Sequence, residues 1–212
     1  MSDEQLTALA IAAGNGDRAA LAEFIRSTQR DVWRFVAHLT DVQSADDLTQ
    51  ETFLRAIGSL PRFAGRSTAR TWLLSIARRV VVDRFRSAAA RPQKANVEDW
   101  QQTMEQRRRD HDVPDFPEEV VIADLMRALP DDRREAFVLT QVLGLSYAEA
   151  AQTVGCPVGT IRSRVARARE TLIIELQAAD GLRQAIAEPS AAPVRLLPGG
   201  RGPATTGFAE VV

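Results

Sequence analysis

Cysteine and histidine are scarce in this chain of 212 residues, which has one cysteine, Cys156, and two histidines, His38 and His111. A single cysteine excludes an internal disulfide and any metal site built from several cysteines. Neither histidine has an evident metal-binding partner in the sequence. We therefore expect no metal centre and no cofactor.

Long apolar runs are also missing, since no segment approaches the length of a membrane-spanning helix. The first ten residues, MSDEQLTALA, are acidic and lack the basic-then-apolar order of a signal peptide. The expectation is a cytoplasmic protein that has no membrane segment.

The sequence offers no convincing two-residue alternation of apolar and polar residues, so no β-strand is predicted. It also has no glycine-rich phosphate loop, and its acids are not grouped with His, Ser or Cys in a catalytic arrangement. An enzyme is therefore not expected. Apolar residues recur instead at helical spacing, which predicts an all-α protein with two small helical domains joined by a flexible linker.

The predicted first domain spans residues 17–88 and follows a short helix in the segment 1–16. Asp17 is the expected N-cap of a helix over residues 18–39. Ser44, with Asp47 three residues later, predicts the start of a second helix. The predicted buried stripe of that second helix is Leu48, Thr52, Phe53 and Ile57, with Leu60 beyond it. A third helix over about residues 69–88, capped by Ser67 or Thr68, has an inner side of Trp72, Leu73, Ile76, Ala77, Val80 and Val81.

Residues 89–117 lack a sustained apolar period and contain several prolines, which is typical of a linker. Helical spacing resumes at residue 118, and the predicted second domain spans residues 118–178. Within it Pro130 begins a helix whose first turn holds two acids, as the helix dipole favours. Residues 179–212 are rich in Pro, Gly, Ala and Thr, so we expect a disordered tail.

The strongest motif in the chain is a helix-turn-helix over residues 145–172. A short helix over residues 147–154 is followed by the breakers Gly155 and Pro157 and by a helix over residues 158–172 with several arginines. The predicted inward positions are Leu145, Ala148, Ala151, Val154, Ile161, Val165, Ala168 and Leu172. Arg162 and Ser163 lie early in the second helix, where such helices meet base edges in the major groove. The alternative is a solvated helix in which arginines pair with acids such as Glu170 and Glu175.

Charge is unevenly distributed although the net charge is only −1. Residues 41–60 contain four acids and one base, whereas residues 61–91 contain eight arginines and one acid. This pattern suggests two kinds of partner, a basic protein surface and an anionic polymer. Phe63 and Trp72 among the arginines suit single-stranded nucleic acid, although they equally suit a core with a solvated basic face. The acidic residues Asp46, Asp47, Gln50 and Glu51 also have the alternative of being only a solvated face.

Three segments together resemble the extracytoplasmic-function (ECF) subfamily of sigma-70-type RNA polymerase sigma factors. DDLTQETFLRAI is similar to region 2.2, RTWLLSIARRVVVDRFR to regions 2.3 and 2.4, and LPDDRREAFVLTQVLGLSYAEAAQTVGCPVGTIRSRVARARETL to region 4. The resemblance spans about residues 17–176 and, within the subfamily, points to actinobacterial members similar to sigma factor C. It implies a factor that binds core RNA polymerase and directs initiation at promoters with −10 and −35 elements.

The resemblance also implies roles for individual residues. Core-polymerase binding, at the β′ clamp helices, maps onto Asp47, Gln50 and Glu51. The −10 region of the DNA maps onto Arg62, Phe63, Arg66, Arg78, Arg79, Asp83, Arg84 and Arg86, although family members commonly have Asn in place of Arg79. The −35 region maps onto Thr160, Arg162, Ser163, Arg164, Ala166 and Arg167. The expected partners are core polymerase (the β′ clamp helices and the β flap) and promoter DNA, with an anti-sigma factor as a candidate partner and no membrane.

Two other functions compete with this interpretation. A stand-alone helix-turn-helix regulator with a ligand-sensing domain would bind duplex DNA tightly without polymerase, usually as a dimer. The acidic segment 46–51 and the arginine-rich helix argue against it, because a sensor domain needs neither. A nucleic-acid enzyme would need a catalytic constellation that the sequence does not show.

Overall fold

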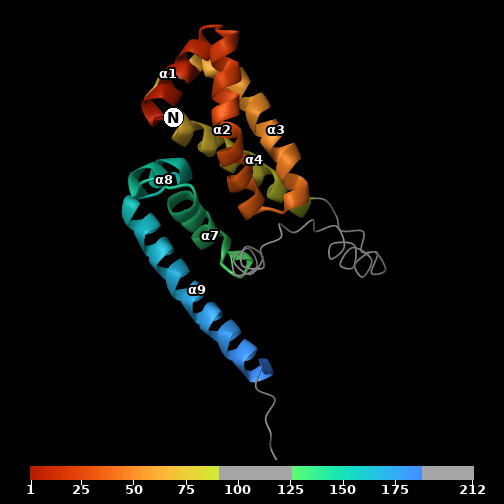
Figure 1. Ribbon diagram of the computed structural model, residues 1–212. Coiled ribbons are helices and arrows are strands. Elements are labelled where there is room, and N and C mark those ends of the chain that lie inside the picture. Colours follow the sequence, from red (N-terminus) through yellow and green to blue (C-terminus); the bar gives the residue numbers. More distant parts are fainter. Residues whose placement is uncertain (91–125, 188–212) are drawn as a thin grey trace, which may run out of the picture. The chain divides into compact units, whose positions relative to one another are not determined.

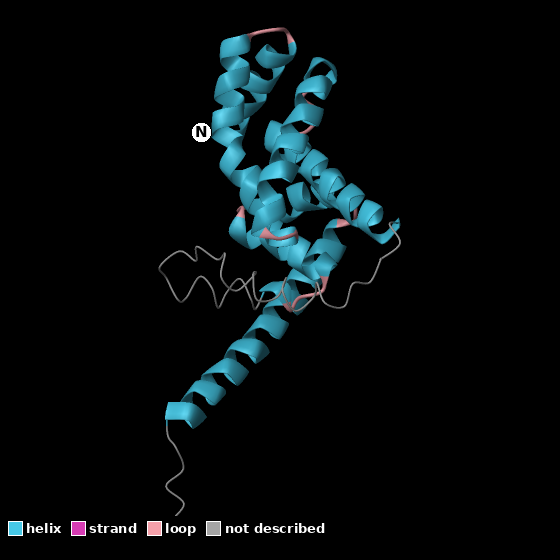
Figure 2. Cartoon of the chain, turned by 90° about the vertical axis from the view of Figure 1, so that its right-hand side faces the viewer, coloured by secondary structure: helices cyan, strands magenta, loops and turns pink. Residues whose placement is uncertain are grey.

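The computed structural model describes residues 1–90 and 126–187, and over these ranges every regular element is helical, as Figure 2 shows. The predicted all-α fold is confirmed. The contacts between residues group Met1–Leu176 into one compact unit and assign Gln177–Val212 to another.

The first part of the chain is a bundle of four helices, coloured red to yellow in Figure 1. They are α1 (Asp3–Gly14), α2 (Arg18–Leu39), α3 (Val42–Ser59) and α4 (Ala69–Ala90), with the short 3₁₀ helix η1 (Leu60–Arg62) after α3. α2 packs against α1, α3 and α4, and α3 also packs against α4. These packed faces bury the residues that the sequence marked as apolar at helical spacing, among them Phe24, Val32, Phe35, Leu73, Val80 and Val81.

The helix starts show where capping was predicted well and where it was not. Asp17 caps α2 as expected, because its carboxylate accepts hydrogen bonds from the backbone N–H groups of Ala19 and Ala20. The predicted start of α3 at Ser44 is wrong. Asp41 is the N-cap, and its carboxylate accepts both the backbone N–H and the hydroxyl of Ser44. Asp is as good an N-cap as Ser, so the earlier acid began the helix.

The buried side of α3 also differs from the prediction at one position. Leu48, Thr52, Phe53 and Leu60 are buried as expected, whereas the Ile57 side chain is 39% exposed. Ala56 lies at the buried position in its place, because it continues the stripe from Thr52 and Phe53 at four- and three-residue spacing.

The described residues after position 125 form the helix-turn-helix and the helix before it. They comprise α7 (Asp131–Phe137), the π-helical turn η2 (Val138–Val142), α8 (Tyr147–Val154) and α9 (Val158–Ala187). Pro130 precedes α7, and Asp131 and Asp132 occupy its first turn, as predicted. The predicted end of the last helix at residue 172 is wrong, since α9 continues to Ala187.

Several sequence predictions lie outside the described residues. They are most of the linker 89–117, the start of the helix expected from residue 118, and residues 188–212 of the predicted disordered tail 179–212. For residues 179–187 the prediction of disorder is wrong, because they form the last turns of α9. The domain boundaries at residues 17–88 and 118–178 likewise stay predictions.

Gly14 provides a test of how tightly α1 is packed. A Cβ at this position would lie 2.6 Å from the carbonyl oxygen of Leu60, far inside normal contact. We predict that Gly14→Ala lowers the free energy of unfolding by about 1–3 kcal/mol, because the backbone of η1 must shift.

Gly58→Ala is the matched control, because a Cβ there meets nothing within 4 Å. As a helix-interior substitution it should instead stabilise by up to about 1 kcal/mol. Urea unfolding followed by circular dichroism measures both. Equal effects of the two substitutions would contradict the close packing of α1 on η1.

Candidate nucleic-acid interface

The turn between α8 and α9 has the geometry of a helix-turn-helix. A capping box begins α8: the Ser146 hydroxyl accepts the Glu149 N–H, and the Glu149 carboxylate accepts the Ser146 N–H at 2.9 Å. Gly155 ends α8 with φ of +76°, a left-handed conformation that glycine adopts without steric cost. The turn therefore follows directly from local sequence.

The helix-turn-helix is anchored by a small set of buried residues. Those on α8 and α9 are Ala150, Ala151, Thr153, Ile161, Val165 and Ala168. Ala148, predicted to point inward, is exposed, and Ala150 occupies the buried position instead. Alanines let the two helices approach closely, which fixes the direction of α9 relative to α8.

The outer side of the first turns of α9 carries the polar residues predicted to read DNA. Arg162, Ser163, Ala166 and Arg167 are exposed, and Thr160 is half-buried. Among the described residues, neither the guanidinium group of Arg162 nor that of Arg167 forms an ion pair or a hydrogen bond. Both guanidinium groups are therefore available to bases or phosphates.

Two other arginines of α9 are engaged within the protein. Arg164 pairs with Asp132 on α7, with 3.1 Å between Nε and the carboxylate oxygen. Arg169 donates a hydrogen bond of 2.7 Å to the side-chain oxygen of Gln141. Arg164 was predicted to contact DNA, but the structure places it half-buried at the junction of α9 and α7.

The outer side of α4 presents a second basic surface. Arg79, Arg84 and Arg86 are exposed and make no ion pair with other described residues. Asp83 is also exposed, and it lies four residues after Arg79 on the same face. The opposite side of α4 is buried over the stretch from Leu73 to Val81, so the helix is fixed while its arginines remain solvated.

Arg78 differs from its neighbours because it faces a buried acid. Its Nε lies 2.7 Å from a carboxylate oxygen of Glu135, which is almost fully buried. Burial raises the pKa of Glu135 above its ordinary value, although Arg78 and, more weakly, Arg164 act in the opposite direction. The loss of hydration of the carboxylate thus outweighs its attraction to the two guanidinium groups.

Arg70, which the sequence did not single out, is held in a similar way. Its guanidinium lies 2.7 Å from the carboxylate of Asp31 on α2, and it also donates a hydrogen bond of 2.7 Å to the backbone oxygen of Leu143. Arg70 and Arg78 are thus occupied by other residues of the chain, in contrast to Arg79, Arg84 and Arg86.

The loop 60–68, which comprises η1 and the residues that connect it to α4, contains three of the residues predicted for the −10 region. Arg62 and Arg66 are exposed and unpaired among the described residues. Phe63 is half-buried, and its ring packs against that of Trp72 with 4.8 Å between centroids. Phe63 therefore anchors the loop to α4, and the two arginines project from it.

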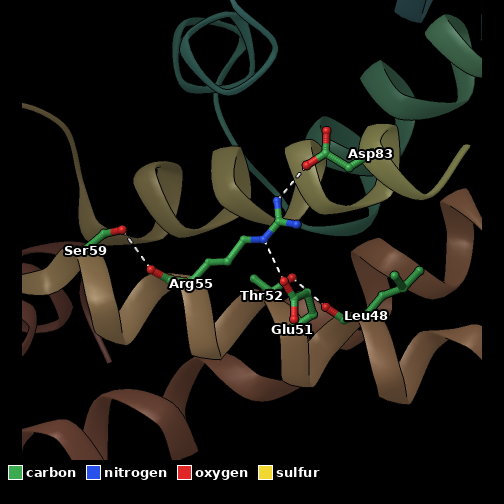
Figure 3. A network of polar contacts seen from close by, with 6 residues as sticks. All are labelled: Leu48, Glu51, Thr52, Arg55, Ser59 and Asp83. Carbon is green, nitrogen blue, oxygen red and sulfur yellow. Dashed lines mark hydrogen bonds and ion pairs between the residues drawn. The ribbon is translucent and has the colours of Figure 1, made fainter. Parts of the chain in front are cut away.

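The residues predicted to bind polymerase lie along α3. Asp47 and Gln50 are exposed, and Glu51 is half-buried. Glu51 accepts a hydrogen bond of 2.8 Å from Nε of Arg55, and the same guanidinium donates one of 2.7 Å to Asp83 on α4 (Figure 3). The hydrogen bonds to Asp83 and Glu51 raise the pKa of Arg55. Arg55 therefore connects the acidic side of α3 to the basic side of α4.

Two apolar residues on α3 extend this surface beyond what the sequence predicted. Leu54 is 67% exposed, and Ile57 follows it by three residues and is also exposed. Together with Gln50 and Glu51 they form one continuous strip at helical spacing, which we call the α3 strip (Asp47, Gln50, Glu51, Leu54 and Ile57). The available signal was that Leu54 falls outside the buried stripe, since Phe53 and Ala56 already fill it.

Other kinds of site were also sought over residues 1–90 and 126–187. No cluster of His, Cys, Asp or Glu there could hold a metal ion. Among the helices of these ranges none is both long and apolar enough to cross a membrane.

A helix-turn-helix with unpaired arginines, accompanied by a helical bundle with a second basic face, defines an all-α DNA-binding protein. Comparison with known proteins identifies the family. Residues 24–91 match the family description "Sigma-70 region 2", and residues 119–172 match "Sigma-70, region 4".

The chain is 53% identical over 178 residues to the probable RNA polymerase sigma-C factor of Mycobacterium bovis, covering 84% of this chain and 95% of the relative. The ECF RNA polymerase sigma factor SigC of Mycobacterium tuberculosis matches to the same extent. The RNA polymerase sigma-H factor of Pseudomonas aeruginosa is 32% identical over 84% of this chain and 96% of its own length. The chain therefore belongs to the sigma-70-type RNA polymerase sigma factors, in the ECF subfamily.

Solved structures agree on the fold. CnrH, solved in complex with the cytosolic domain of CnrY, aligns with a TM-score of 0.62 at 24% identity, over 82% of this chain and 98% of that one. The sigma factor RpoE of Bartonella quintana, solved with the anti-sigma factor NepR, aligns with a TM-score of 0.53 at 24% identity, over 74% and 96% of the two chains.

The raised pKa of Glu135 predicts how the Arg78–Glu135 pair responds to pH. Because the folded protein holds a proton on Glu135 more tightly than the unfolded chain does, ionisation of Glu135 costs folding stability as pH rises through the raised pKa. We predict that the stability of the native protein relative to Glu135→Gln falls between mildly acidic and neutral pH.

The measurement is urea unfolding of both proteins across that pH range. Taking their difference cancels the titration of every other group. A relative stability that rises with pH would mean that the attraction of Arg78 dominates over the burial of Glu135.

Proposed function

We propose that this ECF sigma factor divides its work among three surfaces. The α3 strip binds core RNA polymerase, the loop 60–68 with the exposed arginines of α4 binds the −10 region, and the first turns of α9 read the −35 element. As a sigma factor it directs promoter-specific initiation by RNA polymerase, and the chemistry of RNA synthesis belongs to the polymerase. It acts in the cytoplasm, where the polymerase is.

The observation that carries the proposal is the coexistence of two basic surfaces with an acidic and apolar strip in one chain. Duplex reading needs a rigid helix with free donors, which Arg162 and Arg167 provide on α9. Strand opening needs cations beside an unstacked base, which the loop arginines and α4 provide. A stand-alone regulator explains the first surface but leaves the other two without a role.

The α3 strip suits a protein partner better than a nucleic acid. Its carboxylates would repel phosphates, and its exposed leucine and isoleucine gain from being covered. The acids would then face basic groups of the partner at the rim of the contact. The anti-sigma factor suggested by the family resemblance stays a prediction.

Arg70 and Arg78 are proposed to act differently from the free arginines of α4. Their guanidinium groups are occupied by Asp31, Leu143 and Glu135, so DNA could meet them only after these contacts break. The −10 contacts are therefore assigned first to Arg62, Arg66, Arg79, Arg84 and Arg86, with Phe63 as the anchor of the loop and Asp83 held by Arg55.

Run-off transcription tests the function as a whole. The purified chain with core polymerase should start transcripts at defined promoters that core enzyme alone ignores, and mapping the 5′ ends gives both promoter elements. Absence of binding to core polymerase in a pull-down would refute the function.

Leu54 tests the polymerase surface without risk to the fold, because it is mostly exposed. Leu54→Ala should weaken binding to core polymerase about tenfold, since a leucine buried at an interface contributes on the order of 1–2 kcal/mol. Gln29→Ala, which truncates an exposed uncharged side chain on α2, is the control and should leave this affinity unchanged. Equal losses of affinity for core polymerase in both variants would refute the role of the α3 strip.

Arg162 tests the −35 surface. Arg162→Ala should lower discrimination between the mapped −35 duplex and a scrambled one by about 1–3 kcal/mol, as expected for a base-contacting arginine. Arg18→Ala removes the same charge from the exposed start of α2 and should change neither affinity nor discrimination. If Arg162→Ala weakened both duplexes equally, Arg162 would be a phosphate contact only.

A further inference from the structure

Helix α1 precedes the part of the chain that matches sigma region 2, which begins at residue 24. It nevertheless contacts η1, which forms the start of the loop 60–68, and α4, which follows that loop. Thr7 lies against Ala69 of α4, Ile11 against Gly65 of the loop and Gly14 against Leu60 of η1. The spacing of four and three places these α1 residues on one face of the helix.

Thr7 holds the beginning of α4. Its hydroxyl oxygen accepts the backbone N–H of Ala69, the first residue of α4, at 3.0 Å, and the same hydroxyl donates to the backbone oxygen of Asp3 at 2.7 Å. The first N–H groups of a helix have no partner within the helix, so Thr7 satisfies one of them from 62 residues away.

Ile11 and Gly14 lie against two other points of the loop. A Cβ placed on Gly65 would lie 3.5 Å from Cδ1 of Ile11 and 4.0 Å from Cγ2 of Thr7, so the loop backbone lies directly on α1. Gly65 has φ of +65°, which fixes a sharp bend at that point. Gly14 lies against the backbone of Leu60, where the loop begins.

The loop is thus held along its length from one helix. Its start lies on Gly14, its bend on Ile11 and its end on Thr7, while the contact between Phe63 and Trp72 holds it from α4. The exposed arginines Arg62 and Arg66 project between these fixed points.

We propose that α1 is a template that holds the loop 60–68 in the shape that accepts an unstacked base of the −10 strand. Thr7 and Ile11 are positioning residues, because they act on the base only through the loop. A loop that is already ordered loses less freedom on binding, so it rewards the correct base more strongly. This inference rests on the proposed −10 role of the loop.

The test uses the full-length protein with core polymerase and a single-stranded oligonucleotide of the mapped −10 nontemplate sequence. Its affinity is compared with that of the same oligonucleotide with one abasic position, and the ratio of the two measures base discrimination. Thr7→Val keeps the size of the side chain and removes the acceptor. We expect it to lower the ratio by about fivefold, as the loss of a helix cap would, with affinity for core polymerase unchanged.

Two variants separate positioning from general stability. Thr7→Ser keeps the hydroxyl and should restore discrimination. Thr28→Val removes a fully buried hydroxyl of α2 that bonds only within its own helix, and it should leave the ratio unchanged. A native ratio in Thr7→Val, or an equal loss in Thr28→Val, overturns the proposal. If Thr7→Val does not fold, the same affinity ratio is measured for Ile11→Ser. A lowered ratio would support the proposal, and a native ratio would overturn it.

Hydrogen exchange of the free protein tests whether α1 orders the loop separately from the proposed −10 role. Thr7→Val should speed exchange of the Ala69 amide and of the loop amides 62–68, and Thr28→Val should not. Faster exchange without any effect of Arg66→Ala on oligonucleotide binding would refute the −10 role and with it the template. Unchanged exchange together with a loss in Arg66→Ala would refute the template alone.

Discussion

The burial of one side of α4 is the constraint on which the rest of the structure depends. Leu73, Leu74, Ile76, Ala77, Val80 and Val81 all face the interior. Their burial places Arg79, Arg84 and Arg86 on the solvent side of the same helix, where the cost of removing a charge from water is avoided. The basic surface of the protein is therefore a direct result of hydrophobic packing, and it is as rigid as the core beneath it.

The ion pairs of α4 differ in how much water reaches them. Arg55 forms ion pairs with both Glu51 on α3 and Asp83 on α4, so these two carboxylates share one guanidinium group at the surface. Such exposed pairs add little stability, and their effect is mainly to fix side-chain positions. Arg78, in contrast, meets a carboxylate that burial makes reluctant to ionise. The free arginines of the loop, α4 and α9 are those for which the described chain offers no acid.

The sequence predicted the fold well where local signals were strong. Asp17 and Gly155 act on their immediate neighbours, so the start of α2 and the end of α8 could be placed from sequence alone. The start of α3 could not, because Asp41 and Ser44 are both good caps and the choice depends on packing. Ile57 was misplaced because an apolar residue at helical spacing can face either the core or a partner.

In the candidate site, too, local signals predicted single positions but not the contacts between distant residues. The exposed positions of Arg162, Arg79 and Asp47 followed from periodicity and family resemblance. The pairing of other charged residues did not. Pairs such as Arg164–Asp132, Arg78–Glu135 and Thr7–Ala69 join residues far apart in the chain, and no local pattern predicts them. The contribution of α1 to the loop became visible only from these distances.

We propose that the loop 60–68 and the free arginines of α4 open the −10 region, while α9 holds the −35 element. Permanganate footprinting on the mapped promoter tests it most directly, because it detects unpaired thymines in the complex with core polymerase. Arg66→Ala combined with Arg79→Ala should abolish thymine reactivity in the −10 region and leave the −35 element protected from nuclease. Full reactivity in this double variant would contradict the account.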